Sequence, residues 1–289
     1  MAESTTSRPC LTTGLHRNVA ERVYRDYDAL NASIVKHGIG RGSSLRAMKH
    51  AIDNPKEPTA AMDLGTLLHA KILEPETFLD RVAIWEGGAR RGKVYEEFEA
   101  ANAGRIIIKP DEAATIARMA DAVMDNRRAR VLFNAAGERE CVAIWNTRLG
   151  FQCKARIDYL NTDEMILVDL KTCRSADDGA WARAAEDLKY DVQAAWYRWG
   201  FEHVTGKPCK VAFVAVENEG LHRCRVFMIP PDVLAVCDEA FANLLPMWGE
   251  ARKSGAYPDI EFNDPTEVIW PAWSNRTVYK EPTDDDVPF

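Results

Sequence analysis

The chain has 289 residues, of which 46% are hydrophobic, so it can bury the core of one large domain or two small ones. Its seven cysteines are scattered without a CxxC pair, which excludes the usual zinc-ribbon and iron–sulfur sites and indicates a reduced, cytoplasmic compartment. No stretch approaches the roughly 18 apolar residues that a membrane-spanning helix needs, so we expect a soluble protein.

The acidic residues are concentrated at the C-terminal end. The formal net charge is −7, but residues 259–289 alone contribute −6, so the other 258 residues are nearly neutral. A local basic groove for nucleic acid is therefore compatible with the rest of the chain. We expect a flexible N-terminus over residues 1–20, one folded domain over 21–258 and an acidic tail over 259–289.

The first half of the chain is predicted to be mainly helical. The spacing of apolar residues indicates helices over 19–32, 45–52 and 61–73, and Ser43 or Ser44 can cap the second. A strand-like run at 82–85 precedes the loop GGARRGK (87–93), a polar helix and a strand at 105–109. A long helix is expected over 110–133.

From Glu140 the apolar spacing changes to the two-residue period of strands. The runs ECVAIW, FQCKARIDYL and MILVDLKTC are separated by turn-rich segments, which predicts an antiparallel meander. A helix over 181–204 is expected to cover the meander, and 211–217 and 223–229 supply further strands. The predicted fold class is α/β, with a mixed central sheet flanked by helices.

Two charged residues lie inside the strand ILVDLKTC (166–173). Side chains alternate faces along a strand, so Asp169 and Lys171 share one face with Leu167, whereas Val168 and Leu170 share the other. The two charges therefore converge on one spot. A solvated ion pair on a half-exposed sheet is the alternative explanation of such a pair.

A second carboxylate is expected near Asp169. If residues 161–164 form a hairpin loop, Asp158 lies opposite Leu167 and diagonal to Asp169 on the same face, about 7 Å away. Two such carboxylates can share Mg²⁺ or Mn²⁺, which accept phosphate oxygens as further ligands. Lys171 could stabilise charge on the phosphate or help to deprotonate an attacking water, and Glu140 could supply a third carboxylate.

Three residues of the expected covering helix form one stripe. Tyr190, Gln193 and Tyr197 fall at positions i, i+3 and i+7. They could bind a nucleotide phosphate or base, or they could simply satisfy buried hydrogen bonds. His69 is similarly ambiguous, because a single histidine on an apolar helix is more often a core residue than a metal ligand.

The loop GGARRGK matches the first seven positions of the P-loop GxxxxGK[ST], and ILVD could pass for the Asp-bearing strand of an ATPase. However, Val94 lacks the hydroxyl that holds Mg²⁺, and arginines are larger than the residues that form a phosphate nest. Arg90, Arg91 and Lys93 better suit contacts with a nucleic-acid backbone or terminal phosphate, unless the loop is only solvated.

Taken in order, these motifs resemble the PD-(D/E)XK (restriction-endonuclease-like) nuclease superfamily, and within it the RecE-type exonucleases (exodeoxyribonuclease VIII) of phages and prophages. The resemblance runs from about Ala32 to Trp248 and rests on DLGTLLHAKILEPE, ECVAIW with CKARIDYL, ILVDLKTC and YDVQAAWY. It implies Mg²⁺-dependent, 5′ to 3′ digestion of linear double-stranded DNA, which leaves a 3′ single strand for an annealing protein. It also implies a ring-shaped homo-oligomer threaded by DNA.

The same resemblance assigns residues to roles. The residues that it places at or near the metal are His69, Glu140, Asp158 and Asp169, where Asp169 stands in place of the commoner Glu. Lys171 completes the catalytic Asp-x-Lys pair, and Gln193 and Tyr197 fall on the QxxxY helix motif. An inactive, metal-binding DNA-end clamp that scaffolds the annealing protein is the alternative function.

The C-terminal sequence PTDDDVPF resembles the acidic tip of bacterial single-stranded-DNA-binding proteins. We hypothesise that this tip docks a single-strand annealing protein of the RecT type or another tip-binding protein. A solvated acidic tail is the alternative. The tip comprises Asp284, Asp285, Asp286, Val287, Pro288 and Phe289.

Deletion of residues 284–289 should abolish the pull-down of such a partner and leave the nuclease rate unchanged, because the tip lies outside the expected catalytic motifs. Pull-down by the full-length and shortened chains measures the difference. Equal capture by both chains would contradict the docking hypothesis.

Overall fold

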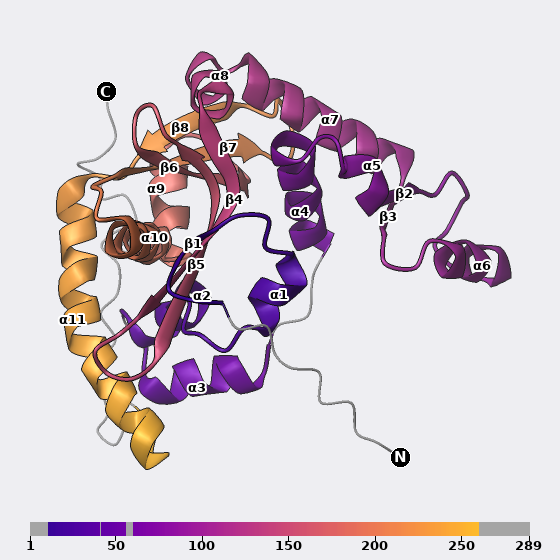
Figure 1. Ribbon diagram of the computed structural model, residues 1–289. Helices are drawn as coiled ribbons and strands as arrows, with labels where there is room; N and C mark the ends of the chain where they lie inside the picture. The colour runs from indigo at the N-terminus through magenta and orange to yellow at the C-terminus, as the bar shows by residue number, and fades with distance from the viewer. Residues whose placement is uncertain (1–10, 41, 56–59, 260–289) are drawn as a thin grey trace, which may run out of the picture. The chain divides into compact units, whose positions relative to one another are not determined.

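The fold is built on a six-stranded mixed sheet. The computed structural model describes residues 11–40, 42–55 and 60–259. In sheet order the strands are β1 (Gly14–His16), β4 (Gly137–Asn146), β5 (Gln152–Asn161), β6 (Ile166–Cys173), β7 (Lys210–Glu217) and β8 (Cys224–Met228) (Figure 1). The strands β6 and β7 are parallel, and the other neighbours are antiparallel. The predicted mixed sheet with an antiparallel meander is therefore confirmed.

The register of β5 and β6 differs from the predicted one by two residues. Leu160 pairs with Leu167, and Asn161 with Ile166, so the connecting loop comprises residues 162–165. The expectation that Asp158 lies opposite Leu167 is therefore wrong. The loop begins one residue later than the sequence suggests because Asn161 stays in the ladder, where its side-chain oxygen accepts from the Glu164 backbone N–H (2.9 Å).

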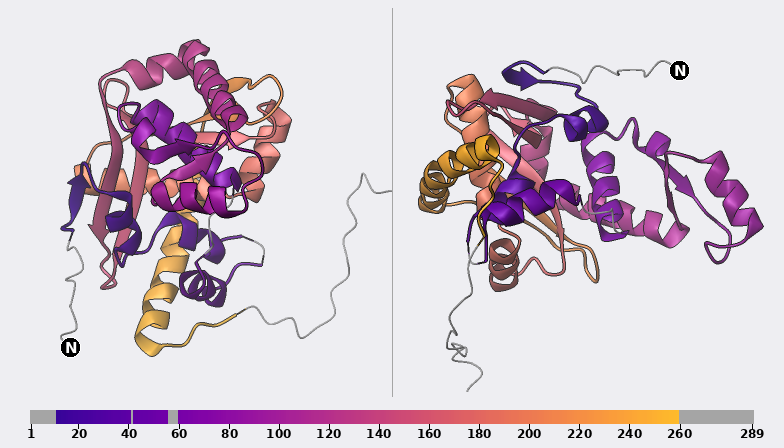
Figure 2. Two further views of the ribbon diagram at one scale, coloured as in Figure 1. Left: turned by 90° about the vertical axis from the view of Figure 1, so that its right-hand side faces the viewer. Right: turned by 90° about the horizontal axis from the view of Figure 1, so that it is seen from below.

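Helices cover both faces of the sheet (Figure 2). One face packs against α2 (Ala32–Val35), α3 (Leu45–Asp53), α9 (Asp178–Asp187), α10 (Tyr190–Thr205) and α11 (Pro231–Ser254), and the other against α4 (Ala60–Leu73), α7 (Pro110–Asp125) and α8 (Arg127–Asn134). The strand β6 contributes to both cores, because Leu167 faces the first and Val168 and Leu170 face the second. None of the helices in the described part of the chain has the length and apolarity of a membrane-spanning segment.

Three predicted helices are interrupted. The N-terminal one, expected over 19–32, is limited to α1 (Glu21–Asp26), because Leu30 hydrogen-bonds the backbone of β5 before α2 begins at Ala32. The one expected over 110–133 is divided at Asn126, whose side chain caps α8. The covering helix is divided at Lys189, which has a left-handed backbone conformation (φ 53°). A short 3₁₀ helix, η1 (Lys36–Gly38), follows α2. The sequence did not predict α11.

The N-terminal segment that is expected to be flexible over residues 1–20 contains the strand β1. Gly14–His16 pair with Val142–Ile144 of β4 through the backbone. A three-residue edge strand needs few apolar anchors, which is why the apolar spacing did not reveal it. Residues 1–10 lie outside the described residues, and so do residues 260–289 of the predicted tail with the docking tip.

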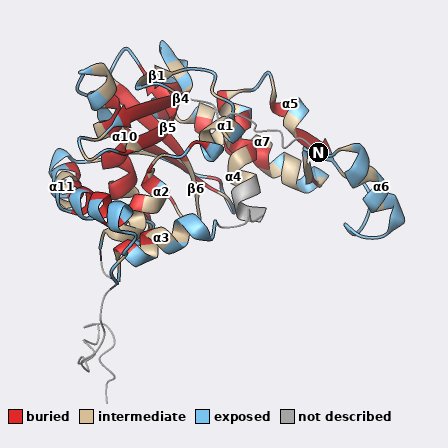
Figure 3. Ribbon diagram, turned by 60° about the horizontal axis from the view of Figure 1, so that its bottom comes forward, coloured by how far each residue is buried: buried red, intermediate tan, exposed pale blue. Residues whose placement is uncertain are grey.

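Residues 78–108 form an arm that extends from the layer of α4 and α7 (Figures 1 and 3). It contains α5 (Phe78–Arg81), β2 (Val82–Ile84), the largely exposed α6 (Lys93–Ala101) and β3 (Ile106–Ile108), and β2 and β3 form a separate parallel pair. The P-loop-like segment follows β2, whereas ILVD lies in β6 of the other sheet. The two parts of the ATPase alternative therefore do not lie in one sheet.

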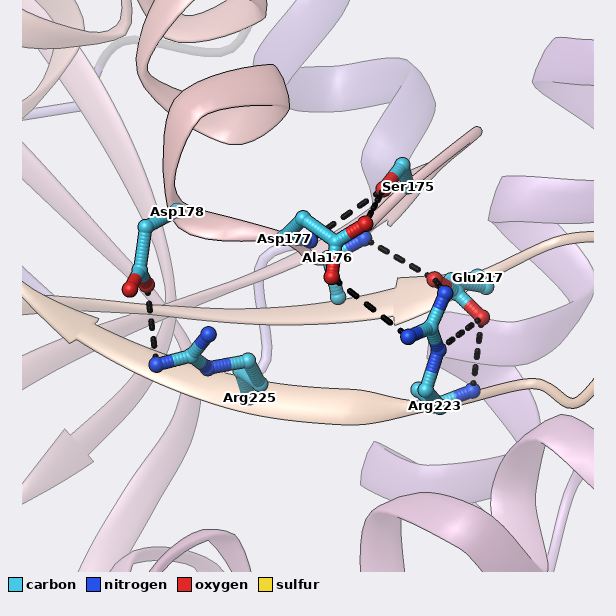
Figure 4. A network of polar contacts seen from close by, with 7 residues as sticks. All are labelled: Ser175, Ala176, Asp177, Asp178, Glu217, Arg223 and Arg225. Atoms are coloured by element: carbon cyan, nitrogen blue, oxygen red, sulfur yellow. Dashed lines mark hydrogen bonds and ion pairs between the residues drawn. The ribbon is translucent and has the colours of Figure 1, made fainter.

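A buried carboxylate anchors the connection that follows β6 (Figure 4). Glu217, at the end of β7 and only 3% exposed, accepts hydrogen bonds from the backbone of Ala176 (3.1 Å) and from the backbone and side chain of Arg223 (3.1 Å each). Arg223 also pairs with Asp177 (3.4 Å). Burial alone raises the pKa of Glu217, but these hydrogen bonds outweigh it and lower the pKa below its usual value.

The Glu217→Ala substitution should lower the free energy of unfolding by about 2–4 kcal/mol at pH 7, because it leaves buried donors unsatisfied. The lowered pKa adds stability above the unfolded pKa of about 4.3, and this stability is lost as the pH falls through the folded pKa. Urea denaturation at pH 7 and pH 3 measures both effects. The exposed Glu219→Ala variant is the control, with an expected change of at most about 0.5 kcal/mol.

Candidate active site

The central acids lie where β5 and β6 separate. The ladder between these strands ends at the pair Tyr159 and Val168, so Asp158 and Asp169 are the first residues beyond it. The Asp158 Oδ2 accepts from the Leu170 backbone N–H (2.8 Å), which replaces the missing ladder partner. Both acids are buried, with 9% of Asp158 and 2% of Asp169 exposed.

Asp169 has two side-chain partners. Its Oδ2 pairs with Lys171 Nζ at 2.5 Å, and its Oδ1 accepts from Gln193 Nε2 at 2.7 Å. Burial lowers the pKa of Lys171, but Asp169 and Asp158 outweigh burial and raise it above its usual value. The ammonium of Lys171 is therefore charged at neutral pH, and it lies 5.2 Å from the centre of the Tyr190 ring.

His69 reaches the acids from α4. Its Nε2 lies 2.7 Å from the Leu170 carbonyl, which can only accept, so Nε2 carries the proton. Its Nδ1 lies 3.5 Å from Asp158 Oδ2. Burial and the charge of Lys171 lower the pKa of His69, which keeps the ring neutral and leaves Nδ1 available to a metal.

Glu140 is brought to the same place by a distortion of β4. It has a left-handed backbone conformation (φ 50°), which is strained for a non-glycine residue inside a strand. Its carboxylate is paired with Arg156. Burial and Asp158 raise the pKa of Glu140 above its usual value.

These residues fit a divalent cation. One ligand atom each from His69, Glu140 and Asp158 lie within 4.8 Å of one another. The two carboxylates are typical ligands of Mg²⁺ and Mn²⁺, whereas a neutral imidazole is more typical of transition-metal ions. Burial and neighbouring Asp169 raise the pKa of Asp158 to about 8, and a cation would offset both effects. Asp169, the expected fourth ligand, contacts Lys171 and Gln193.

The QxxxY residues connect α10 to Asp169. Besides its bond to Asp169, Gln193 Nε2 donates to the Tyr197 hydroxyl (3.2 Å). Gln193 Oε1 accepts from Lys36 Nζ (3.0 Å). An ammonium can only donate, so Lys36 fixes the amide with its NH₂ group toward Asp169. The sequence did not reveal Lys36, because its role depends on residues far away in the chain.

The expected DNA-binding loop lies apart from this cluster. Arg90 pairs with Glu112, Lys93 lies 3.9 Å from Glu97, and none of Arg90, Arg91 and Lys93 lines the cavity described below. The structure therefore brings together the predicted metal residues, Lys171, Tyr190, Gln193 and Tyr197, but not the basic loop.

A cavity of about 690 Å³ opens onto the acids. Its walls come from α1, α4, α5, β4, β5, β6 and the start of α10. Arg156, two residues before Asp158, also lines it and was not singled out from the sequence, although strand alternation places it on the Asp158 face. The residues of interest in its lining are His69, Glu140, Arg156, Asp158, Lys171 and Tyr190.

Comparison with known proteins identifies the class. Residues 41–260 match the family described as PDDEXK-like domain of unknown function (DUF3799), so the chain belongs to this family. A search of curated proteins found no match. The fold is therefore that of the PD-(D/E)XK nuclease superfamily.

Two solved structures resemble the chain. A protein from Eubacterium rectale, described as a candidate exonuclease, aligns with a TM-score of 0.61 and 14% identity over 93% of this chain and 97% of its own. A phage-related exonuclease from Haemophilus somnus 129PT aligns with a TM-score of 0.37 and 11% identity over 79% of this chain and 96% of its own. The first of these structures supports the fold.

The Asp158→Asn substitution should stabilise the metal-free protein at alkaline pH. A folded pKa of about 8 means that the free energy of unfolding falls as the pH rises from the unfolded value of 3.8 through 8, because the folded protein resists ionisation. In EDTA at pH 8.5 the variant should melt roughly 4 °C or more above the wild type, equivalent to at least about 1–2 kcal/mol. At about pH 3.5 the two should be similar, because Asp158 is then largely protonated in both the folded and the unfolded wild type.

Thermal melts at both pH values measure this effect, and the exposed Asp121→Asn variant is the control. A variant no more stable than the wild type at pH 8.5 would contradict the burial argument.

Proposed function

We propose that the protein is a divalent-metal-dependent exonuclease that digests linear double-stranded DNA. The observation that carries the proposal is that His69, Glu140, Asp158 and Lys171 line one cavity of a PD-(D/E)XK fold, with Asp169 paired to Lys171. The resemblance to RecE-type enzymes supports a 5′ to 3′ direction and 3′ single-stranded products for annealing-type recombination.

The side chains have separable roles in this proposal. A cation held by His69, Glu140 and Asp158, with Mg²⁺ as the expected ion and Mn²⁺ as a substitute, would supply Lewis acidity and an activated water. Lys171 donates to a phosphate oxygen and stabilises the charge that develops there. Asp169 holds the Lys171 ammonium in place, and Gln193 holds Asp169.

The direct test is digestion of blunt linear duplex DNA that is labelled at its 5′ or 3′ end, with Mg²⁺ or EDTA and a closed circular control. Early release of the 5′ label as mononucleotide, with intact circles and no reaction in EDTA, is the expected result. DNA that is bound at its ends and never cut would replace the nuclease proposal with the inactive end clamp.

Two substitutions test the assigned roles. Asp169→Asn keeps an acceptor for Gln193 but loses the charge that holds Lys171, and Lys171→Ala loses the ammonium itself. Each should lower the cleavage rate by about 100-fold or more. Lys171→Ala should leave metal binding unchanged because a lysine ammonium is not a ligand, whereas Asp169→Asn should also weaken metal binding because it removes a negative charge and an expected ligand. Single-turnover cleavage and Mn²⁺ titration measure the two properties. The exposed Lys210→Ala variant is the control, and full activity in Lys171→Ala would refute its role.

The partners of the proposed enzyme remain predictions. They are linear duplex DNA, a RecT-type annealing protein docked on residues 284–289, and further copies of the chain in a ring-shaped homo-oligomer.

A further inference from the structure

Arg156 lies beside the candidate metal group with unused hydrogen-bonding capacity. It comes from β5, where it pairs with Val142 of β4, and Glu140 lies two residues before Val142. The side chain is only 17% exposed. Its Nε is bound by Glu140, whereas its Nη1 is buried and has no hydrogen-bond partner among the described residues. A buried donor without a partner is costly, so this nitrogen is a candidate ligand-binding atom.

The chemistry of this nitrogen favours a phosphate. A guanidinium presents several N–H donors in a planar fork that matches phosphate oxygens. Arg156 lines the same cavity as Lys171. The other cavity arginines, Arg25 and Arg81, are each paired with a glutamate that also lines it.

Glu140 serves two groups at once. The carboxylate that binds Arg156 also belongs to the group of three ligand atoms within 4.8 Å of one another. Without a cation, the negative charge of Glu140 neutralises Arg156 and repels a phosphate that approaches it. With a cation in the group, that charge is shared, and the attraction between Arg156 and a phosphate is restored.

We propose that Arg156 and Glu140 form a metal-gated phosphate site, in which Glu140 masks Arg156 until a divalent cation occupies the His69, Glu140 and Asp158 group. The site rests on the proposed function, because its natural ligand would be a phosphate of the DNA substrate or product. Arg156 would bind that phosphate only after the metal is in place, so metal binding would precede productive DNA binding.

The test measures binding of deoxyadenosine monophosphate to the full chain by calorimetry, in Mg²⁺ and in EDTA. The wild type should bind at least about tenfold more tightly in Mg²⁺. Arg156→Met should bind the nucleotide about tenfold more weakly than the wild type in Mg²⁺ and about equally well in EDTA. Arg156→Lys should bind with an affinity between these two in Mg²⁺. Arg198→Met is the matched control, because Arg198 is 18% exposed and ion-paired but lies outside the cavity.

Glu140→Gln supplies a test that does not depend on the loss of a function. Removal of the masking charge should raise affinity for the nucleotide in EDTA by about fivefold or more over the wild type, whereas a merely structural ion pair predicts no gain. Unchanged affinity of Glu140→Gln in EDTA, or wild-type affinity of Arg156→Met in Mg²⁺, would overturn the proposal.

The outcomes separate this site from the nuclease proposal. Arg156-dependent nucleotide binding in a chain that cuts no DNA would support the phosphate site and refute the nuclease. If the chain cleaves DNA but the wild type and Arg156→Met bind the nucleotide equally well, the nuclease proposal is supported and the phosphate site is overturned.

Discussion

The burial of Asp158 beside Asp169 is the constraint on which the rest of the site depends. Two carboxylates out of water repel each other, and each loses its hydration. Asp169 is stabilised by Lys171 and Gln193. The Asp158 Oδ2 accepts from a backbone N–H and lies near the neutral His69, but burial and the charge of Asp169 raise the pKa of Asp158 to about 8. The metal-free protein therefore holds a proton where the proposed enzyme would hold a cation.

The two hydrophobic cores keep this unfavourable arrangement in place. Leu167 packs toward α10 and α11, and Val168 and Leu170 pack toward α4 and α7, so β6 is fixed from both sides. A strand held in this way cannot move Asp169 away from Asp158 without opening a core, which costs several kcal/mol. The apolar residues of β6 thus determine the position of its charged ones.

How much the sequence could predict depends on the range of each interaction. The shared face of Asp169 and Lys171 follows from strand alternation, which holds in any register. The register of β5 against β6 did not follow, because it depends on whether Asn161 stays in the ladder. The helix break at Lys189 was also missed, since a left-handed lysine has no local sequence signal. Lys36 and Arg156 gain their roles only from distant partners, Gln193 and Glu140.

Glu140 shows how stability and function are connected through the metal. Its left-handed backbone costs of order 1–3 kcal/mol, and its charge adds to the repulsion around Asp158. Such a residue persists only where its surroundings hold it, and here the paired strands and Arg156 do so. A cation that binds only the folded state would raise the free energy of unfolding, by about 2.7 kcal/mol when its concentration is a hundred times the dissociation constant. The side chains that destabilise the metal-free protein are therefore the same ones that would favour binding of the metal.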